Sequence, residues 1–366
     1  MEKVYPHGAN TKAIADEFGI SEDNLIDYSS NINPLGMPNC ARQAAAAALE
    51  TAALRYPDAQ YTLLRQALAA VYAVDEQQIL PGNGGAELIP AVVEALPIKR
   101  VVICEPAFGE YAQAAAIHGL ACELLAPAPD FSYDLLAASH MLCAGDLLFL
   151  CSPNNPTGII TLPEKLEEIV ATAQIRGAWC LVDESFLEFI EGHEAMTMLR
   201  LVAQYDRLLV LRSMTKFYGM PGLRSGFIAG NAEALAAIRE HLPVWSVNCI
   251  AEAATIAAIT DKAFALTTRK YIENERNFLI NSLTDIGGFR IISGEANYLF
   301  ADIRQSGVSS DVWQKRLIRE GILIRNCNSY PCLGNGFLRF AVRSRCENEL
   351  FIASVIKTAG QIREGI

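Results

Sequence analysis

The residue with the clearest chemical potential is Lys216, which ends the segment Ser213-Met214-Thr215-Lys216 and is followed eight residues later by Arg224. A lysine amine near a cationic neighbour has a lowered pKa and can attack an aldehyde, whereas an arginine fork matches the geometry of a phosphate. The grouping therefore indicates covalent capture of an aldehyde that carries a phosphate. A Ser-x-x-Lys segment alone also occurs around serine nucleophiles. Other segments of the chain are therefore needed to distinguish a serine nucleophile from a lysine that captures an aldehyde.

Three other segments place polar or small residues after apolar, strand-like runs. Asn155 lies in Cys151-Ser152-Pro153-Asn154-Asn155-Pro156-Thr157-Gly158, Asp183 ends the run that begins at Trp179, and Gly82-Asn83-Gly84-Gly85-Ala86 precedes a helix-like stretch. Each segment alone is typical of a turn or a helix cap. At a helix N-terminus, however, small residues let backbone amides approach an anion. Together with the lysine segment, they place residues that can bind an anion at the ends of apparent strands.

In this order, the four segments resemble the cofactor-binding segments of fold-type I pyridoxal 5'-phosphate (PLP) enzymes. The resemblance implies that Lys216 carries the cofactor covalently, that Asn155 hydrogen-bonds the phenolic oxygen of its ring, and that Asp183 pairs with the pyridinium nitrogen. Such a charge-assisted hydrogen bond contributes about 1.5 to 3 kcal/mol and keeps the ring an electron sink. The further cofactor-binding residues that it implies are Tyr56, Gly84, Gly85, Ala86, Phe108, Ser213 and Arg224. Phe108 matches an aromatic that stacks on the ring, and a plain core phenylalanine is the competing interpretation.

Composition limits the possible functions of the chain. It has 366 residues, 51% of them hydrophobic, which is long enough for two domains around large cores. The net charge of −11 argues against a nucleic-acid or membrane-surface partner. The sequence contains neither a signal-peptide segment nor an apolar stretch of membrane-spanning length, so we expect a soluble, cytoplasmic protein. The ten cysteines are scattered without a Cys-x-x-Cys pair, which indicates reduced packing residues and no metal site.

The pattern of apolar runs predicts the fold class. Between about residues 79 and 230, short apolar runs alternate with stretches of helical period, which predicts an α/β fold with a mostly parallel sheet and ligands at the carboxyl ends of its strands. The later segments predict helices that break near Thr260-Asp261 and then a small α+β unit. We expect an N-terminal arm (1–40), a large PLP-binding domain (41–245), and connecting helices with a small C-terminal domain (246–366).

The ends of the chain resemble threonine-phosphate decarboxylases in particular. The segments that carry this resemblance are His7-Gly8-Ala9-Asn10, the stretch from Asp27 to Pro38, Trp245 to Asn248, and Leu323-Ile324-Arg325. Ala9 departs from the usual His-Gly-Gly-Asn opening, which weakens the transfer of backbone contacts at that position. Histidinol-phosphate aminotransferases share the segment around Tyr56, the lysine segment and the context of Arg339, and they remain the alternative.

The resemblance also implies how substrate is bound. Arg325 and Arg339 offer two guanidinium forks for the two anionic ends of a short phosphorylated amino acid. His7, Gly8, Asn31 and Asn155 complete the implied substrate-binding set. Without the resemblance, His7 is interpreted as a mobile N-terminal residue. Because Tyr56 matches a tyrosine that reaches the cofactor phosphate of the partner subunit, a homodimer is implied.

We therefore expect a PLP-dependent decarboxylase of L-threonine O-3-phosphate that serves cobalamin biosynthesis, with Lys216 and Asp183 as catalytic residues. Histidinol-phosphate aminotransferase is the alternative activity. A degenerate or regulatory PLP-binding module is a third interpretation, which the complete set of catalytic-type residues disfavours. The cofactor residues are common to decarboxylase and aminotransferase, so they do not separate the first two.

Overall fold

The computed structural model describes residues 8–284, 286, 288–292 and 294–364, and it has a seven-stranded sheet at its centre. The strand order is β2-β8-β7-β6-β5-β3-β4, in which β3 to β7 run parallel while β8 is antiparallel to both of its neighbours. The strands are β2 (Ile79–Gly82), β3 (Arg100–Cys104), β4 (Ala121–Leu125), β5 (Asp146–Cys151), β6 (Trp179–Asp183), β7 (Leu208–Ser213) and β8 (Gly226–Gly230). The predicted α/β class with a mostly parallel sheet is confirmed.

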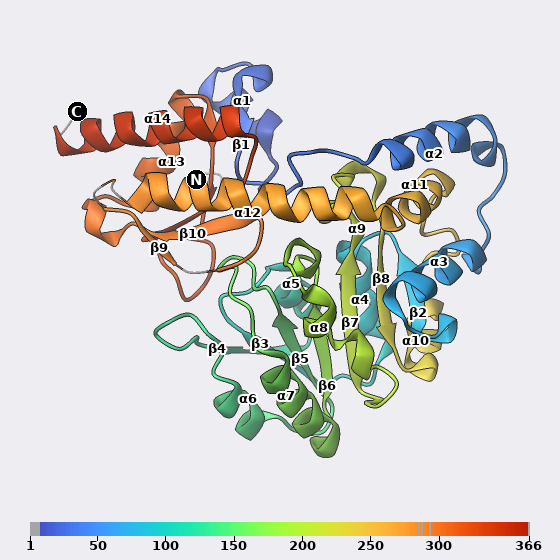
Figure 1. Cartoon of the computed structure of the whole chain (residues 1–366). Helices are drawn as coiled ribbons and strands as arrows, with labels where there is room; N and C mark the ends of the chain where they lie inside the picture. Colours follow the sequence, from blue (N-terminus) through green and yellow to red (C-terminus); the bar gives the residue numbers. More distant parts are fainter. Residues whose placement is uncertain (1–7, 285, 287, 293, 365–366) are drawn as a thin grey trace.

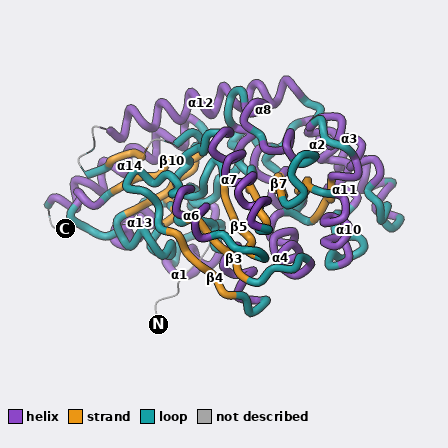
Figure 2. Tube along the Cα trace, turned by 90° about the horizontal axis from the view of Figure 1, so that it is seen from below, coloured by secondary structure: helices purple, strands orange, loops and turns teal. Residues whose placement is uncertain are grey.

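Helices cover both faces of this sheet (Figure 2). Alternate residues of one strand therefore enter different cores: Val102 and Leu148 pack in one cluster, Val101 and Leu147 in another. Burial on both faces explains why the inner strands β5 to β8 read as mostly apolar runs, whereas the edge strand β4 is largely exposed. The helices of this part of the chain are α3 (Thr62–Tyr72), α4 (Gly85–Ala95), α5 (Glu110–Ile117), α6 (Leu135–Met141), α7 (Pro163–Arg176), α8 (His193–Met196), α9 (Met214–Phe217) and α10 (Ala232–Glu240).

A long helix links this sheet to the C-terminal elements. Figure 1 shows α12 (Lys262–Thr284) running above the large sheet, from α11 (Cys249–Ile259) towards the orange and red end of the chain. The break between the two helices falls at Thr260-Asp261 as predicted, because the Asp261 carboxylate accepts a hydrogen bond of 2.9 Å from Phe264 N and so caps α12. Helix α2 (Asn39–Glu50) packs beside α11.

The C-terminal elements form a second, smaller sheet of four strands in the order β12-β13-β10-β9. Its strands are β9 (Arg290–Ile292), β10 (Tyr298–Asp302), β12 (Arg325–Asn326) and β13 (Phe337–Ala341), accompanied by α13 (Ser310–Arg319) and α14 (Arg345–Arg363). Ser344 and Glu347 form a capping box at the start of α14.

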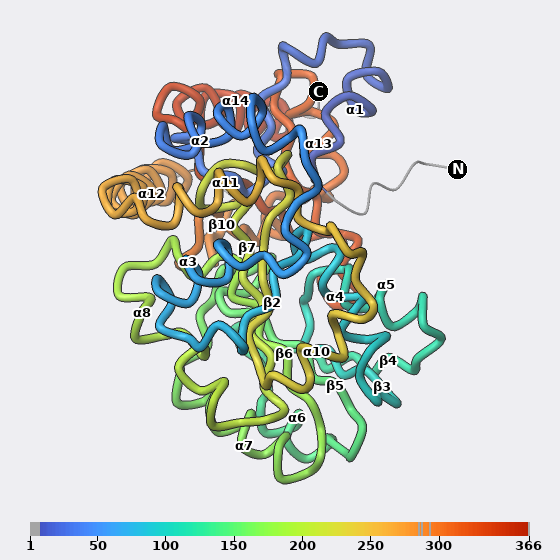
Figure 3. Tube along the Cα trace, turned by 90° about the vertical axis from the view of Figure 1, so that its right-hand side faces the viewer, coloured from blue at the N-terminus to red at the C-terminus, as the bar shows by residue number. Residues whose placement is uncertain are grey.

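The N-terminal segment lies against these C-terminal elements, as Figures 1 and 3 show for α1 (Thr11–Phe18). Strand β1 (Ile26–Asp27) pairs in parallel with β11 (Ile322–Leu323), and Ala341 N donates a hydrogen bond of 2.8 Å to Tyr28 O. This pairing brings the residues just after β1 to the small sheet, close to Arg339.

All ten cysteines are free, and Cys104, Cys151 and Cys180 are buried in the large sheet. Within the described part of the chain, no helix combines the length and apolar character needed to cross a membrane.

Candidate active site

A cavity of about 610 Å³ opens at the carboxyl ends of the parallel strands, between the large and the small sheet. Its walls include ten of the residues predicted for the site: Gly8, Asn31, Ala86, Phe108, Asn155, Asp183, Lys216, Arg224, Arg325 and Arg339. Gly84, Gly85 and Ser213 adjoin the cavity-lining segments in the chain but do not line the cavity. Tyr56 lies elsewhere on the surface, and His7 lies outside the described residues.

Lys216 lies on the single turn of α9, which follows β7 directly. Ser213 caps this turn, because its hydroxyl accepts a hydrogen bond of 3.4 Å from Thr215 N. Burial, together with the nearby cations of Arg224 and Arg339, lowers the pKa of Lys216 to about 8, while Asp183 opposes the shift. A much larger share of this amine is unprotonated at neutral pH than for a surface lysine, as a nucleophilic lysine requires.

Asp183 is held at the end of β6 by two hydrogen bonds. The Tyr111 hydroxyl donates to its Oδ2 at 2.7 Å, and Ser185 N donates to its Oδ1 at 2.9 Å. Burial raises the pKa of Asp183, and the hydrogen bonds from Ser185 and Tyr111 oppose this rise. A buried carboxylate held in this way is suited to pair with a cation in the cavity.

Sequence reasoning missed Tyr111. Its ring is buried, stacks on Phe149 with centroids 4.6 Å apart, and meets Phe108 edge-on at 5.8 Å. The aromatic spacing Phe108-x-x-Tyr111, which is one helical turn, was a signal for it. Phe108 is only partly buried and lines the cavity, so it is available to a planar ligand as well as to the core behind it.

The beginning of α4 forms a cradle for an anion. Gly84 has φ +83 at the N-cap, and a Cβ there would lie 2.8 Å from Nη2 of Arg224. Only glycine tolerates both this conformation and this approach of the guanidinium. Free backbone amides at a helix start, with a guanidinium above them, fit the phosphate of PLP.

Glu87 ties this cradle to a distant loop. Its Oε2 accepts hydrogen bonds from Asn83 N at 2.7 Å and from the Ser246 hydroxyl. The cradle is thus anchored to the segment that carries Trp245.

Arg339 is buried on β13 and links three parts of the site. Its Nη2 donates a hydrogen bond of 2.5 Å to Ser29 O, and its Nη1 donates to Oδ1 of Asn155. Its Nε and the buried Oδ1 of Asn31 make no hydrogen bond within the described structure. An arginine in such a position retains donor capacity for a ligand.

Arg325, on β12, lies directly opposite Arg339 in the register of the small sheet. Its Nη2 donates a hydrogen bond of 2.7 Å to the Ser329 hydroxyl, and its guanidinium carbon lies 5.6 Å from the centre of the Tyr330 ring. Like charges at opposite positions of a strand pair repel each other, so an anion between them would be stabilising. Ser329 and Tyr330 also line the cavity, and neither was predicted.

The first described residues, Gly8 and Ala9, line the cavity and contact Ser29. Ala9 N donates a hydrogen bond of 3.0 Å to the Ser29 hydroxyl, and a Cβ at Gly8 would lie 2.5 Å from Ser29 O. Ala9 itself has φ +65, in the left-handed region that favours glycine. The departure from the usual His-Gly-Gly-Asn opening thus falls on a residue whose backbone conformation favours glycine.

Tyr56 does not contribute to the cavity of its own chain. It is 79% exposed and stacks on Trp245, with ring centroids 4.3 Å apart.

A buried ion pair that was not predicted lies directly behind the site. Arg212 Nη2 is 2.9 Å from Glu184 Oε2, and each residue is adjacent in sequence to a residue predicted for the cofactor site, Ser213 or Asp183. The pair joins the ends of β7 and β6 at the point where the two strands present those residues.

Comparisons with known proteins identify the family of this chain. Residues 23–355 match the family model described as aminotransferase class I and II. The threonine-phosphate decarboxylase of Salmonella typhimurium is 36% identical over 95% of this chain and 95% of its own length.

Solved structures share the fold. The histidinol-phosphate aminotransferase from Clostridium acetobutylicum superposes with a TM-score of 0.86 at 28% identity, covering 92% of this chain and 100% of that one. The Sinorhizobium meliloti histidinol-phosphate aminotransferase, solved in complex with pyridoxal-5'-phosphate, gives a TM-score of 0.86 at 22% identity, covering 98% of this chain and 96% of that one. The chain therefore belongs to the aminotransferase class I and II family.

Proposed function

We propose that this protein is a PLP-dependent decarboxylase that converts L-threonine O-3-phosphate into CO2 and (R)-1-aminopropan-2-yl phosphate for cobalamin biosynthesis. The observation that carries the proposal is that the N-terminal segment, through Gly8 and Asn31, lines the same cavity as Lys216 and the opposed Arg325 and Arg339. The 36% identity to the Salmonella threonine-phosphate decarboxylase over nearly the whole chain supports the same choice.

When bound, PLP supplies an aldehyde that condenses with amines and a protonated ring that accepts electrons from a bond broken at the substrate Cα. We assign Lys216 as the residue that binds it covalently, with Asp183 at the ring nitrogen and Asn155 at the phenolic oxygen. Gly84, Gly85, Ala86, Ser213 and Arg224 would hold its phosphate, and Phe108 would cover one face of its ring.

The two arginines bind the two anionic ends of the substrate, one guanidinium for each. Arg339 is already fixed by Ser29 and Asn155, and Arg325 by Ser329, so both forks are positioned before substrate arrives. We place Asn31 and Gly8, together with His7, beside the substrate, where they would orient the carboxylate for loss as CO2.

We also assign to Lys216 the transfer of the proton that replaces the carboxylate at Cα. With a pKa of about 8, its amine is largely protonated near neutral pH when it is not engaged covalently, and it can donate that proton to Cα after CO2 has left.

We propose that the chain forms a homodimer, and an exposed aromatic pair supports this proposal. Leu54, Tyr56, Val244 and Trp245 are between 47% and 80% exposed, and together they make an apolar patch of the kind that marks an interface. We propose that a second copy covers this patch and that Tyr56 reaches the cofactor phosphate in the partner's site.

Product analysis tests the reaction. PLP-loaded enzyme should release CO2 and aminopropanol phosphate from L-threonine O-3-phosphate in equal amounts, without requiring a keto acid. The alternative activity is that of a histidinol-phosphate aminotransferase, like the Clostridium protein of similar structure. It would be shown by formation of glutamate from histidinol phosphate and 2-oxoglutarate, without release of CO2 from threonine phosphate.

A further inference from the structure

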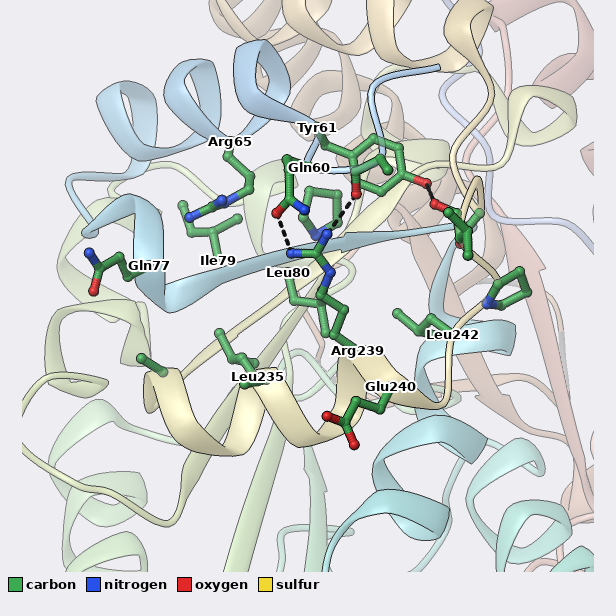
Figure 4. Close-up of a pocket in the computed structure, with 17 residues that line it drawn as sticks. Gln60, Tyr61, Arg65, Gln77, Ile79, Leu80, Leu235, Arg239, Glu240 and Leu242 are labelled. Atoms are coloured by element: carbon green, nitrogen blue, oxygen red, sulfur yellow. Dashed lines mark hydrogen bonds between the residues drawn. The ribbon is translucent and has the colours of Figure 1, made fainter. Parts of the chain in front are cut away.

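A second cavity, of about 430 Å³, lies between α3, β2 and α10 and shares no lining residue with the Lys216 cavity (Figure 4). Strand β2 lies at the edge of the large sheet. No strand pairs with its outer side within the described residues, and the cavity lies there. The volume is within the range of small-molecule sites, roughly 300 to 1,000 Å³.

The walls of the cavity are mostly apolar. Ile79 and Leu80 come from β2, Leu235 from α10, and Leu242 from the loop that follows α10, while the Tyr61 ring closes one side. The Tyr61 hydroxyl is already engaged, because it accepts a hydrogen bond of 3.0 Å from Val247 N and donates one of 3.3 Å to Val244 O. These two hydrogen bonds fix the position of the Tyr61 ring on this side of the cavity.

Two guanidinium groups supply its positive charge, and both donate their hydrogen bonds to neutral oxygens. Arg239 donates to Gln60 Oε1 at 2.6 Å and to Ala59 O at 2.8 Å, and Figure 4 shows its side chain reaching from α10 across to Gln60. Arg65 donates twice to Glu76 O, at 3.0 and 2.6 Å.

Neither arginine takes part in an ion pair among the described residues. Each guanidinium has five N–H groups, of which the contacts above use two, so donors remain for a ligand. The nearby carboxylate of Asp58 accepts hydrogen bonds from Gln60 N and Thr62 N, and Glu240 is exposed on the rim. The chain as a whole has a net charge of −11, so two arginines without ion pairs among the described residues, both on one apolar cavity, form a local region of positive charge.

We propose that this cavity binds a small amphipathic carboxylate, whose apolar body packs on Ile79, Leu80 and Leu235 and whose head group is held by Arg239 and Arg65. Guanidinium forks match carboxylates geometrically, and the apolar walls favour a ligand with a hydrocarbon body. Because Glu240 adds a negative charge to the same rim, a singly charged head is favoured over a doubly charged one.

Calorimetric titration of the full-length, PLP-loaded enzyme with octanoate tests this site, with octanol as the neutral probe of equal length. Octanoate should bind saturably with one site per chain, and octanol should bind at least about tenfold more weakly. Arg239→Gln should weaken octanoate binding by about tenfold, the equivalent of about 1.4 kcal/mol.

A second variant tests the location without relying on charge. Ala236 is exposed and lines the cavity, so Ala236→Trp should fill the space and abolish octanoate binding without disturbing the core. Arg319→Gln, at an exposed arginine on α13, is the matched control and should leave binding unchanged. Melting temperature and turnover of threonine phosphate would show that each variant is folded.

Absence of saturable binding, equal affinity for octanol, or octanoate binding that survives both Arg239→Gln and Ala236→Trp would overturn the proposal. These outcomes distinguish this site from the Lys216 cavity, because both variants leave Arg325 and Arg339 unchanged, so octanoate held there would bind the variants as it binds the wild type.

Discussion

The Tyr111 hydroxyl donates a hydrogen bond of 2.7 Å to the Asp183 carboxylate, and the Tyr111 ring stacks on Phe149. This contact favours the charged form of Asp183 against the burial that disfavours it. The role that we propose for Asp183, holding a protonated ring nitrogen, would thus depend partly on a residue that is distant from it in sequence.

Tyr111→Phe should therefore weaken cofactor binding while preserving the stack. A hydrogen bond to a charged group contributes about 1.5 to 3 kcal/mol, so we expect the affinity for PLP to fall by about tenfold or more, with lower turnover. Equilibrium dialysis against PLP measures this change. Tyr133→Phe, which loses bonds to the Cys151 backbone instead, should leave Asp183 unaffected. Equal effects of the two variants would contradict a specific role for Tyr111.

The pKa of Lys216 predicts the pH dependence of cofactor attachment. Because burial and two arginines lower that pKa from 10.5 to about 8, the reactive neutral amine increases as pH rises through 8 and dominates above it. The rate at which the apoenzyme captures PLP should rise between pH 7 and 9 and then level off. Stopped-flow absorbance gives the midpoint, and borohydride reduction with peptide mass analysis should place the pyridoxyl group on Lys216. A label on Lys262 or Lys270 would contradict the assignment.

Arg325 should control the need for a phosphate on the substrate. Wild-type enzyme should use threonine phosphate far better than threonine, since an unfilled phosphate site leaves buried donors unsatisfied at a cost of about 1 to 3 kcal/mol. Arg325→Ala should narrow the ratio of the two kcat/KM values by about tenfold or more. Arg363→Ala, at an exposed arginine on α14, is the control. If threonine and threonine phosphate are equally good substrates of the wild type, the cavity does not bind phosphate.

Ala9→Gly should stabilise the protein. With φ +65, Ala9 is in a conformation that costs an L-residue roughly 1 kcal/mol and costs glycine little. Urea denaturation should show a free energy of unfolding higher by up to about 1 kcal/mol. Ala237→Gly, inside α10, should lower it by about the same amount. A loss of stability in Ala9→Gly would show that the Cβ of Ala9 makes contacts worth more than its backbone strain.

Glu87→Gln tests the anchoring of the phosphate cradle. The neutral amide is a weaker acceptor for Asn83 N and the Ser246 hydroxyl, so the start of α4 should be held less firmly and PLP affinity should fall several-fold. Glu94→Gln lies on the same helix and loses only a half-exposed contact with His241. Fluorescence titration with PLP compares the two. Unchanged affinity in Glu87→Gln would mean that the cradle is held by backbone geometry alone.

Much of the framework could be predicted from the chain itself, since it depends on local pattern. The runs that form β5, β6 and β7 are mostly apolar because both faces of these strands are buried. A predicted site residue lies at the end of each strand or within four residues after it. The carboxyl ends of parallel strands meet at one edge, so the sequence predicts that Asn155, Asp183 and Lys216 lie together. The break before α12 is likewise visible in the sequence, because Asp261 is a local cap.

The remaining features depend on contacts between distant segments, which no local pattern encodes. The pairing of β1 with β11 and the hydrogen bond from Ala341 N to Tyr28 O bring the segment with Asn31 to the cavity. The register of β12 on β13 sets Arg325 opposite Arg339. The bond from Tyr111 to Asp183 spans 72 residues. Such contacts follow from the path of the whole chain and from the need to satisfy buried polar groups, and tertiary structure alone decided them.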